Sequence, residues 1–306
     1  MTELRKVMSP SRELEATFAP DLAMVGCSLR YRDQELLVLR PGGLQAYGGG
    51  ATMGIPLLYP WANRLAAGAH RVAGRDVVAN ASSPTQKPDG SGTPIHGVIP
   101  RELPFVVREA TLTWLRAELV SSHSPALCAC FPFSHTVTVT AAITDSSLRI
   151  ETTVRAGAEE PVPISFGYHP YIHLPGVPRD EWEIDAPVAT HILTDDLSLP
   201  TGEREQAPIP SGPLAGRTYD DGYADIPDGA AFTLSGGGLR LTVRWLEGYS
   251  FAQVWAPADP QVVCYEPMTA PTNALATGDG LRILQPGEEH RAAFQIEVGQ
   301  TPTALR

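Results

Sequence analysis

A histidine followed by a proline is the first candidate for acid–base chemistry in this sequence. It is His169, in the segment Ser165–Leu174, which reads SFGYHPYIHL. Pro170 favours extended backbone at the residue before it, so we expect His169, Tyr171 and His173 to share one face of a strand. Two histidines four residues apart can hold a metal ion on a helix, but Pro170 breaks such a helix. We therefore predict no metal site and expect a structural or surface role for His173.

A glutamate followed by a proline is the matching candidate for a general base. Glu266 ends an otherwise apolar strand in the segment 261–275, QVVCYEPMTAPTNAL, and Pro267 favours extended backbone at Glu266. A carboxylate at the end of a core strand is costly unless it is paired or used in chemistry. The structural alternatives are a salt bridge for Glu266 and a core histidine with one backbone hydrogen bond for His169.

Three further segments concentrate polar residues that a ligand could contact. The segment GIPLLYPWANRL presents Asn63 and Arg64 at its end, after two prolines. In TPIHG, His96 follows a glycine-rich loop and precedes a small residue, which allows close approach of a ligand. RTYDDGY places Asp220 and Asp221 beside aromatic side chains. Taken singly, each segment is equally compatible with an ordinary surface residue or turn.

Charge and composition exclude several classes of protein. The formal net charge of -11 leaves no basic surplus for binding nucleic acid or an anionic membrane surface, so a neutral small molecule is the better partner. Residues 1–14 lack the apolar run of a signal peptide, and no later stretch has the length of a membrane span. We expect a cytoplasmic protein whose 4 cysteines are reduced and structural.

Alternation of apolar and polar residues predicts an all-β protein. The clearest half-buried strand is 148–155, and the segments 239–245 and 294–298 alternate in the same way. The chain contains 29 prolines and 28 glycines, which leave room for only a few short helices. We predict a large antiparallel β-sandwich and a single domain over 1–306, with a frayed N-terminus over 1–17.

Taken in chain order, five groups of residues resemble the aldose 1-epimerase (galactose mutarotase) family. They are Asn63-Arg64, His96-Gly97, Phe166–Tyr171, Asp220 and Glu266-Pro267. The His-Pro-Tyr and Glu-Pro segments are the most distinctive, and the groups together span most of the chain. The resemblance implies a β-supersandwich fold and a mutarotase that needs no metal or other cofactor.

The same resemblance implies a role for each matched residue. His169 becomes the general acid and Glu266 the general base. Arg64 and His96 would hold the sugar hydroxyls or the region of the ring oxygen, with Asn63 and Tyr171 beside the substrate. Asp220 fits the spacing of a further hydroxyl ligand better than Asp221. Ile172 and Val98 depart from the family pattern, which leaves open the sugar that is bound.

The implied reaction interconverts the α and β anomers of a free hexose. The base removes the proton of the anomeric hydroxyl, the acid protonates the ring oxygen, and the open aldehyde rotates and closes again. Glu266 should therefore be ionised and His169 protonated near neutral pH, with Arg64 helping to stabilise the carboxylate. We expect a monomer or a homodimer.

Three alternatives remain open at this point. A carbohydrate-binding protein without turnover would use aromatic residues such as Trp61, Tyr171 and Trp255 to stack on a sugar. A hexose-phosphate mutarotase of the same superfamily would need several arginines around the pocket; the available ones are Arg64, Arg71, Arg75 and Arg101. A glycoside hydrolase or lyase would need a second carboxylate across from Glu266, and the sequence marks none.

Overall fold

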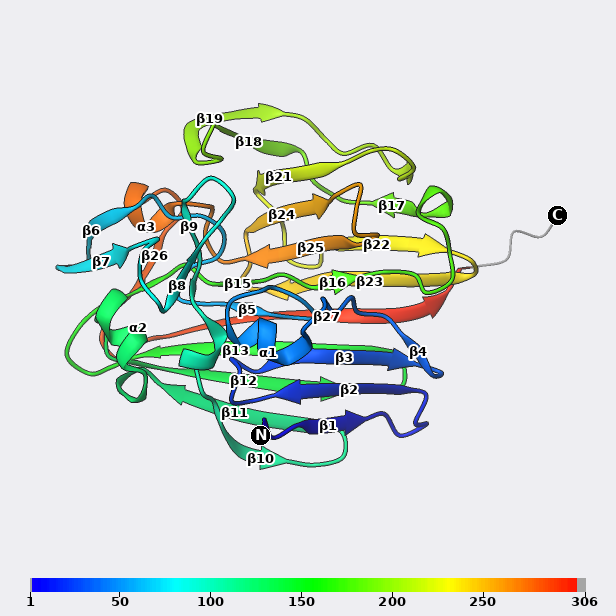
Figure 1. Ribbon diagram of the computed structural model, residues 1–306, viewed down its shortest axis with the longest axis horizontal. Helices are drawn as coiled ribbons and strands as arrows, with labels where there is room; N and C mark the ends of the chain where they lie inside the picture. The colour runs from blue at the N-terminus through cyan, green and yellow to red at the C-terminus, as the bar shows by residue number, and fades with distance from the viewer. Residues whose placement is uncertain (1, 302–306) are drawn as a thin grey trace.

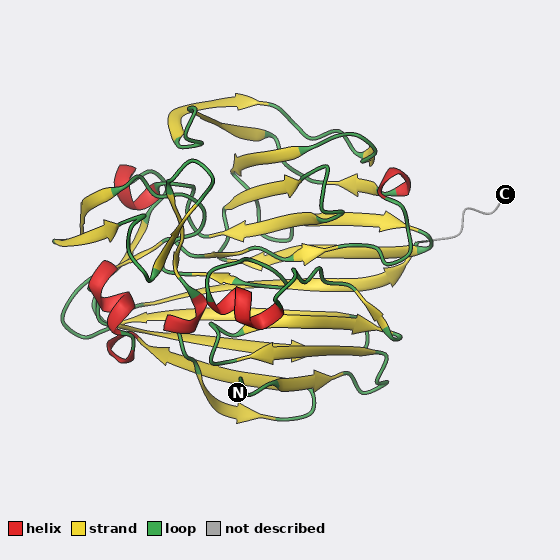
Figure 2. Cartoon of the chain, viewed as in Figure 1, coloured by secondary structure: helices red, strands yellow, loops and turns green. Residues whose placement is uncertain are grey.

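Most of the regular secondary structure consists of β-strands, as the alternation predicts (Figures 1 and 2). A computed structural model describes residues 2–301. Every pairing between the named strands in this range is antiparallel. The three α-helices are short: α1 (Gly43–Gly48), α2 (Pro125–Cys130) and α3 (Ala274–Thr277). The described residues contain no helix that is long and apolar enough to cross a membrane.

One layer of the sandwich is a nine-stranded sheet. Its strands lie in the order β10 (Val106–Ala110), β11 (Trp114–Val120), β12 (His135–Ile143), β13 (Ser147–Ala156), β27 (Glu289–Gln300), β23 (Leu239–Glu247), β22 (Ala231–Gly236), β17 (Glu183–Asp185) and β20 (Gly212–Pro213). The three predicted strands fall in β13, β23 and β27, and β13 alternates strictly between buried and partly buried positions over most of its length. The prediction of these strands is confirmed.

The facing layer contains an eight-stranded sheet that carries the candidate site. Its main path is β19 (Pro200–Gln206), β18 (Thr190–Thr194), β21 (Tyr219–Ala224), β24 (Phe251–Ala256), β25 (Val263–Met268), β15 (Gly167–Tyr168) and β5 (Leu57–Leu58), while β16 (Tyr171–Ile172) also pairs with β25. Three two-stranded pairs complete the fold: β6 (Gly68–Val72) with β7 (Arg75–Ala79), β8 (Gln86–Pro88) with β9 (Pro94–Val98), and β14 (Val162–Ile164) with β26 (Arg282–Leu284).

The residues from Arg5 onward form regular strands, whereas the sequence predicts fraying over 1–17. The N-terminal segment forms a four-stranded sheet of β1 (Arg5–Met8), β2 (Leu14–Ala19), β3 (Val25–Tyr31) and β4 (Gln34–Glu35). Leu14, Ala16 and Phe18 are buried on one face of β2, and this burial holds the segment in place. Isolated bridges between Gly26 and Ile55 and between Leu37 and Ile172 connect this sheet to the layer that carries the site.

A buried contact between the two layers supports the segment that precedes the candidate acid. Tyr168, on β15, packs against Phe294 of β27 with ring centroids 5.0 Å apart. Its hydroxyl is 2.7 Å from the hydroxyl of Thr152, which explains a threonine on the inward face of β13. Because side chains alternate along extended backbone, Tyr168 points into the core and the next residue points the other way.

Candidate active site

The structure brings His169 and Glu266 into direct contact. The segments on either side of His169 both pair with β25: Gly167 lies opposite Met268, and Tyr171 lies opposite Cys264. This register places His169 directly across from Glu266, and His169 Nε2 lies 3.1 Å from Glu266 Oε1. Both residues are buried, with 6% of His169 and 1% of Glu266 exposed. We call these two residues, the candidates for acid and base, the catalytic pair.

Burial shifts the two pKa values in opposite directions. Burial, and then the charge of Asp220, raises the pKa of Glu266 well above its ordinary value, while Arg64 opposes this shift. Burial, followed by the nearby His96, lowers the pKa of His169 well below that of a free imidazole. Both shifts are opposite to those expected for an ionised glutamate beside a protonated histidine. Burial disfavours both charges, so the two shifts favour a neutral pair with the proton on Glu266.

Two polar atoms of the catalytic pair have no hydrogen-bond partner among the described residues. They are His169 Nδ1 and Glu266 Oε2, and both are buried. Buried polar atoms in native proteins are normally paired with protein, water or ligand. Glu266 is thus equipped to accept a hydrogen bond from a bound hydroxyl.

Tyr171 orients the candidate acid. Its ring stacks on that of His169 with centroids 4.4 Å apart and an interplanar angle of 6°. The Tyr171 hydroxyl lies 3.5 Å from His169 Nε2 and 2.5 Å from the hydroxyl of Thr52. Trp255 of β24 packs edge-on against both rings, at 5.6 Å from His169 and 5.8 Å from Tyr171. The imidazole therefore has little freedom to rotate away from Glu266.

His96 is held by unusual backbone geometry at two residues. His96 has a φ of 62° and Asn63 a φ of 56°, a region that few side chains favour. The backbone N–H of Asn63 donates to His96 Nδ1 at 3.2 Å, and the backbone N–H of His96 donates to the backbone carbonyl of Asn63 at 3.0 Å. Burial and the charges of Arg64 and Lys87 lower the pKa of His96 to about 3. His96 is consequently neutral, and with Nδ1 accepting, its Nε2 carries the proton that a ligand oxygen can accept.

Gly97, next to His96, is required by close packing. It has a φ of 71°, and a Cβ atom there would lie 2.2 Å from the carbonyl oxygen of Tyr59. No other residue fits without moving the backbone. The close approach that requires a small residue here is that of the Tyr59–Pro60 backbone, not that of a ligand as the sequence suggests.

Arg64 is fixed by a carboxylate from the glycine-rich loop. Arg64 Nε donates to Asp89 at 2.6 Å, and the other oxygen of Asp89 accepts hydrogen bonds from the amides of Ser91 and Thr93. Burial opposes ionisation of Asp89, but the Ser91 hydroxyl, Arg64 and the two amides outweigh it and lower the pKa of Asp89 to about 2. The Asp89 carboxylate is therefore charged, and it holds the guanidinium at the edge of the site.

Asp220 and Asp221 occupy different positions on β21. Asp220 accepts a hydrogen bond of 2.8 Å from Gln253, which lies opposite Glu266 on the neighbouring strand. Asp221 lies 3.5 Å from His191 and does not reach the cavity of the catalytic pair. The preference for Asp220 as a site residue agrees with this geometry.

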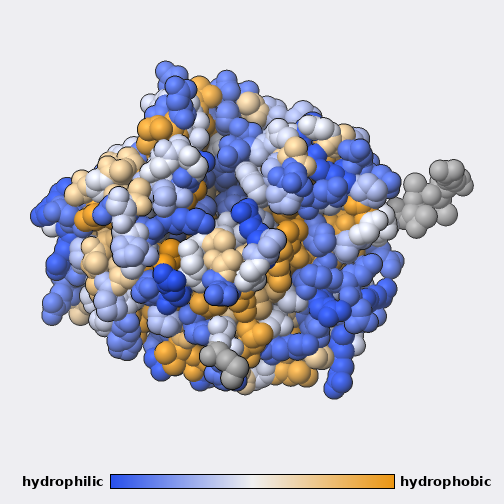
Figure 3. All heavy atoms as spheres, in the orientation of Figure 1, coloured by the Kyte–Doolittle hydropathy of each residue, from blue (hydrophilic) through white to orange (hydrophobic). Residues whose placement is uncertain are grey.

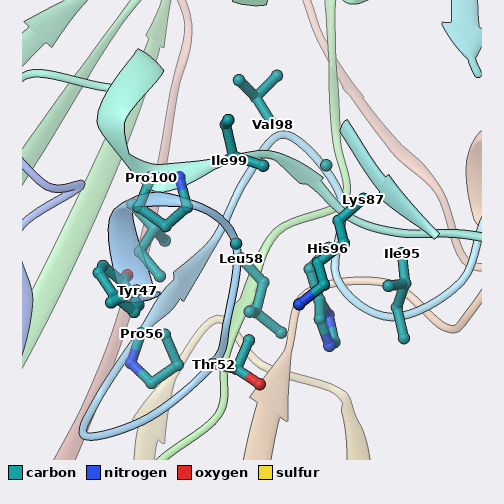
Figure 4. A pocket seen from close by; sticks show the side chains of 13 residues that line it. Tyr47, Thr52, Pro56, Leu58, Lys87, Ile95, His96, Val98, Ile99 and Pro100 are labelled. Carbon is teal, nitrogen blue, oxygen red and sulfur yellow. The ribbon is translucent and has the colours of Figure 1, made fainter. Parts of the chain in front are cut away.

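The residues converge on a cavity of about 160 Å³. It is lined by Arg40, Thr52, Asn63, Arg64, Ile95, His96, His169, Tyr171, Asp220, Gln253, Trp255 and Glu266. All seven predicted site residues are among them. A narrow pocket of about 20 Å³ adjoins it behind Thr52, Ile95 and His96, with Lys87 at its rim (Figure 4).

Sequence reasoning missed Arg40, Thr52 and Gln253. Gln253 lies on a buried strand, where a glutamine is unusual. A glutamine within this apolar segment could therefore have been recognised as a candidate site residue. Arg40 and Thr52 lie in segments with no distinctive pattern, and only the fold shows that they are close to the site. His173 lies outside the cavity lining. Among residues 2–301, no group of three histidine, cysteine or acidic side chains is arranged to hold a metal ion.

Fold and site together define a class: an antiparallel β-supersandwich in which a histidine and a glutamate meet at the base of a polar cavity. The family model of aldose 1-epimerase matches residues 27–297, and the chain belongs to this family. Membership implies a sugar isomerase of the epimerase or mutarotase type.

Individual relatives are distant in sequence. The uncharacterised protein YihR of Escherichia coli K12 is 24% identical over 249 residues, which cover 78% of this chain and 77% of YihR. A galactose mutarotase-like protein from Clostridium acetobutylicum matches with a TM-score of 0.82 and 15% identity, covering 98% of this chain and 99% of that protein. The Slr1438 protein of Synechocystis sp. PCC 6803 matches with a TM-score of 0.80 and 19% identity, covering 98% and 97%. These structural likenesses show a shared fold.

Proposed function

We propose that the protein is an aldose 1-epimerase that interconverts the α and β anomers of a free hexose. The observation that carries this proposal is the buried contact of 3.1 Å between His169 and Glu266 in a polar cavity. Ring opening needs one proton removed from the anomeric hydroxyl and one delivered to the ring oxygen. A pair that holds a single proton between two adjacent groups can perform both transfers without exchange with solvent.

The reaction begins with the proton on Glu266 and with His169 neutral. Transfer of the proton from Glu266 to His169 along their contact gives a carboxylate beside an imidazolium. Glu266 then takes the proton of the anomeric hydroxyl as His169 protonates the ring oxygen, and the bond between the anomeric carbon and the ring oxygen breaks. The open aldehyde rotates and closes on its other face as the two residues reverse their roles.

The remaining polar residues bind and orient the sugar. His96 donates through Nε2, Arg64 donates through its guanidinium, and Asp220 accepts from hydroxyls. Tyr171 positions the imidazole, and Asn63 positions His96 through its backbone amide. General acid and base catalysis typically contribute about 10²–10⁴-fold.

The available charges favour a free hexose over a hexose phosphate. Of the four arginines considered, only Arg64 lines the cavity, and its guanidinium is paired with Asp89. The others form exposed ion pairs elsewhere: Arg71 with Asp76, Arg75 with Glu160, and Arg101 with Glu102. Arg40 does line the cavity, above the ring of Tyr171, so the phosphorylated alternative has one candidate cation.

Comparison of free and phosphorylated sugars tests the proposal. Freshly dissolved α-glucose and α-galactose, and glucose 6-phosphate as the competing substrate, are followed by NMR exchange or polarimetry. We expect acceleration with a free hexose and little with the phosphate. Preference for the phosphate would replace the proposed substrate, and binding without acceleration of any sugar would favour the carbohydrate-binding alternative.

A further inference from the structure

A groove continues from the catalytic cavity toward the β18–β19 hairpin. A second cavity of about 170 Å³ shares four lining residues with the first, namely Asn63, Arg64, Asp220 and Gln253. Pro200 and Thr272 in turn line both the second cavity and a third of about 400 Å³. Figure 3 shows a hollowed, largely hydrophilic surface below this hairpin. Each cavity therefore lies beside the next, and we call this row of three cavities the groove.

The second cavity combines polar and apolar groups in a way that suits a sugar ring. His191 and Asp221, which lie 3.5 Å apart, and the exposed Thr194 offer hydrogen-bond donors and acceptors. Ile192 and Met268 are buried and give the cavity an apolar surface. Sugars present both hydroxyls and apolar C–H faces, and binding sites combine apolar linings with a few placed polar groups.

We propose that the groove binds a reducing oligosaccharide, with the reducing unit in the catalytic cavity and the next unit in the second cavity. The inference rests on the proposed function for the placement of the reducing unit. In this placement, the anomeric carbon and ring oxygen of the reducing pyranose face His169 and Glu266, and the opposite edge of the ring faces the residues shared with the second cavity. The second unit is therefore linked through oxygen 3 or oxygen 4 of the reducing unit.

The third cavity extends the same path. It lies between β19 and the residues that precede and follow α3, where Arg204 and Asp279 form an ion pair of 3.0 Å. Its lining also includes Pro200, Thr272 and Thr277, so it combines apolar surface with a few polar groups. A third sugar unit would lie here, at the exposed end of the groove.

Calorimetric binding tests the groove independently of turnover. The wild-type protein is titrated with glucose, laminaribiose (1→3 linked), cellobiose (1→4 linked) and trehalose, which has no free anomeric hydroxyl. We expect at least one of the two reducing disaccharides to bind tenfold or more tightly than glucose, about 1.4 kcal/mol. Trehalose should bind no more tightly than glucose. Equal affinity for glucose and both reducing disaccharides would overturn the proposal.

Two variants locate the second unit. Thr194→Trp fills the second cavity from its exposed rim, and Asp221→Asn removes a charge there without changing shape. The disaccharide gain is the ratio of the affinity for the tighter reducing disaccharide to the affinity for glucose. We expect Thr194→Trp to abolish this gain while it keeps the affinity for glucose. We expect Asp221→Asn to reduce the gain severalfold. Thr138→Trp, on the outer face of the nine-stranded sheet, is the matched control and should keep the gain. A gain that survives in Thr194→Trp would overturn the assignment.

Parallel measurement of anomer exchange separates this inference from the proposed function. A disaccharide gain without acceleration of any sugar would leave the groove standing and remove the proposed enzyme activity. Acceleration of glucose without a disaccharide gain would leave the activity standing and remove the groove as a binding site.

Discussion

Replacing Glu266 with glutamine should stabilise the fold while it removes the catalytic base. The Glu266 side chain is 2% exposed, and its Oε2 atom has no hydrogen-bond partner among residues 2–301. Glutamine has the same shape, carries no charge, and can still donate from its amide to His169 Nε2. The variant therefore keeps the contact with His169 and avoids the cost of a buried carboxylate.

The sign of the pH dependence follows from the raised pKa of Glu266. The folded protein holds this proton more tightly than the unfolded chain, whose glutamate has a pKa near 4.5. The stability contributed by the protonated form is complete below pH 4.5 and is lost as pH rises through the folded-state pKa. The advantage of glutamine should thus grow with rising pH, by up to about 1.4 kcal/mol for each pH unit between the unfolded-state and folded-state pKa values.

Chemical unfolding at pH 5 and pH 8, followed by circular dichroism, measures this difference. Glu203→Gln, at an exposed position on β19, is the matched control and should be within about 0.5 kcal/mol of wild type at both pH values. Activity of Glu266→Gln should fall by at least about 10²-fold. The reasoning fails if Glu266→Gln is less stable than wild type at pH 8, or if its advantage is the same at both pH values.

Three further predictions concern pH, Arg64 and Gly97. Because burial lowers the pKa of His169, kcat/KM should stay level well below pH 6.5, and an acid limb centred at 6.5 would contradict the shift. Asp89→Asn should raise KM about 5–30-fold, with a smaller change in kcat, because Arg64 loses the carboxylate that holds it. In the wild type, the ion pair between Arg64 and Asp89 should persist until pH falls toward 2. An unchanged KM in the variant would show that Arg64 needs no such support. Gly97→Ala should destabilise the protein by about 2–4 kcal/mol in urea unfolding, against about 1 kcal/mol for Gly74→Ala, which has positive φ but open space; equal losses would argue against the close contact.

The sequence was enough to single out His169 and Glu266, which the fold brings into contact, but not to predict the shifts of their pKa values. Proline after His169 and after Glu266 marked both as residues at irregular points of strands, and the register of β25 then brings them together. The degree of burial depends on side chains from several strands that are distant in sequence. The directions of the two pKa shifts were therefore beyond sequence reasoning.

For the fold too, patterns within one strand could be predicted from the sequence, whereas contacts between distant segments could not. Strict alternation identified β13 because one face of that strand is fully buried and the other is only partly buried. The N-terminal strands were missed because the polar segment 9–13 interrupts them, although Leu14, Ala16 and Phe18 carry the same alternation. Gln253 and Thr52 reach the cavity only through pairing and loop geometry, which single residue types do not encode.

The most direct test of the central claim is the anomer exchange of freshly dissolved α-glucose and α-galactose, measured by NMR with wild type, Glu266→Gln and His169→Asn. The account predicts acceleration by wild type with at least one sugar, and loss of nearly all of it in both variants while sugar binding persists. Near-normal exchange in either variant would remove that residue from the mechanism. A wild type that accelerates neither sugar would contradict the proposed activity on free hexoses.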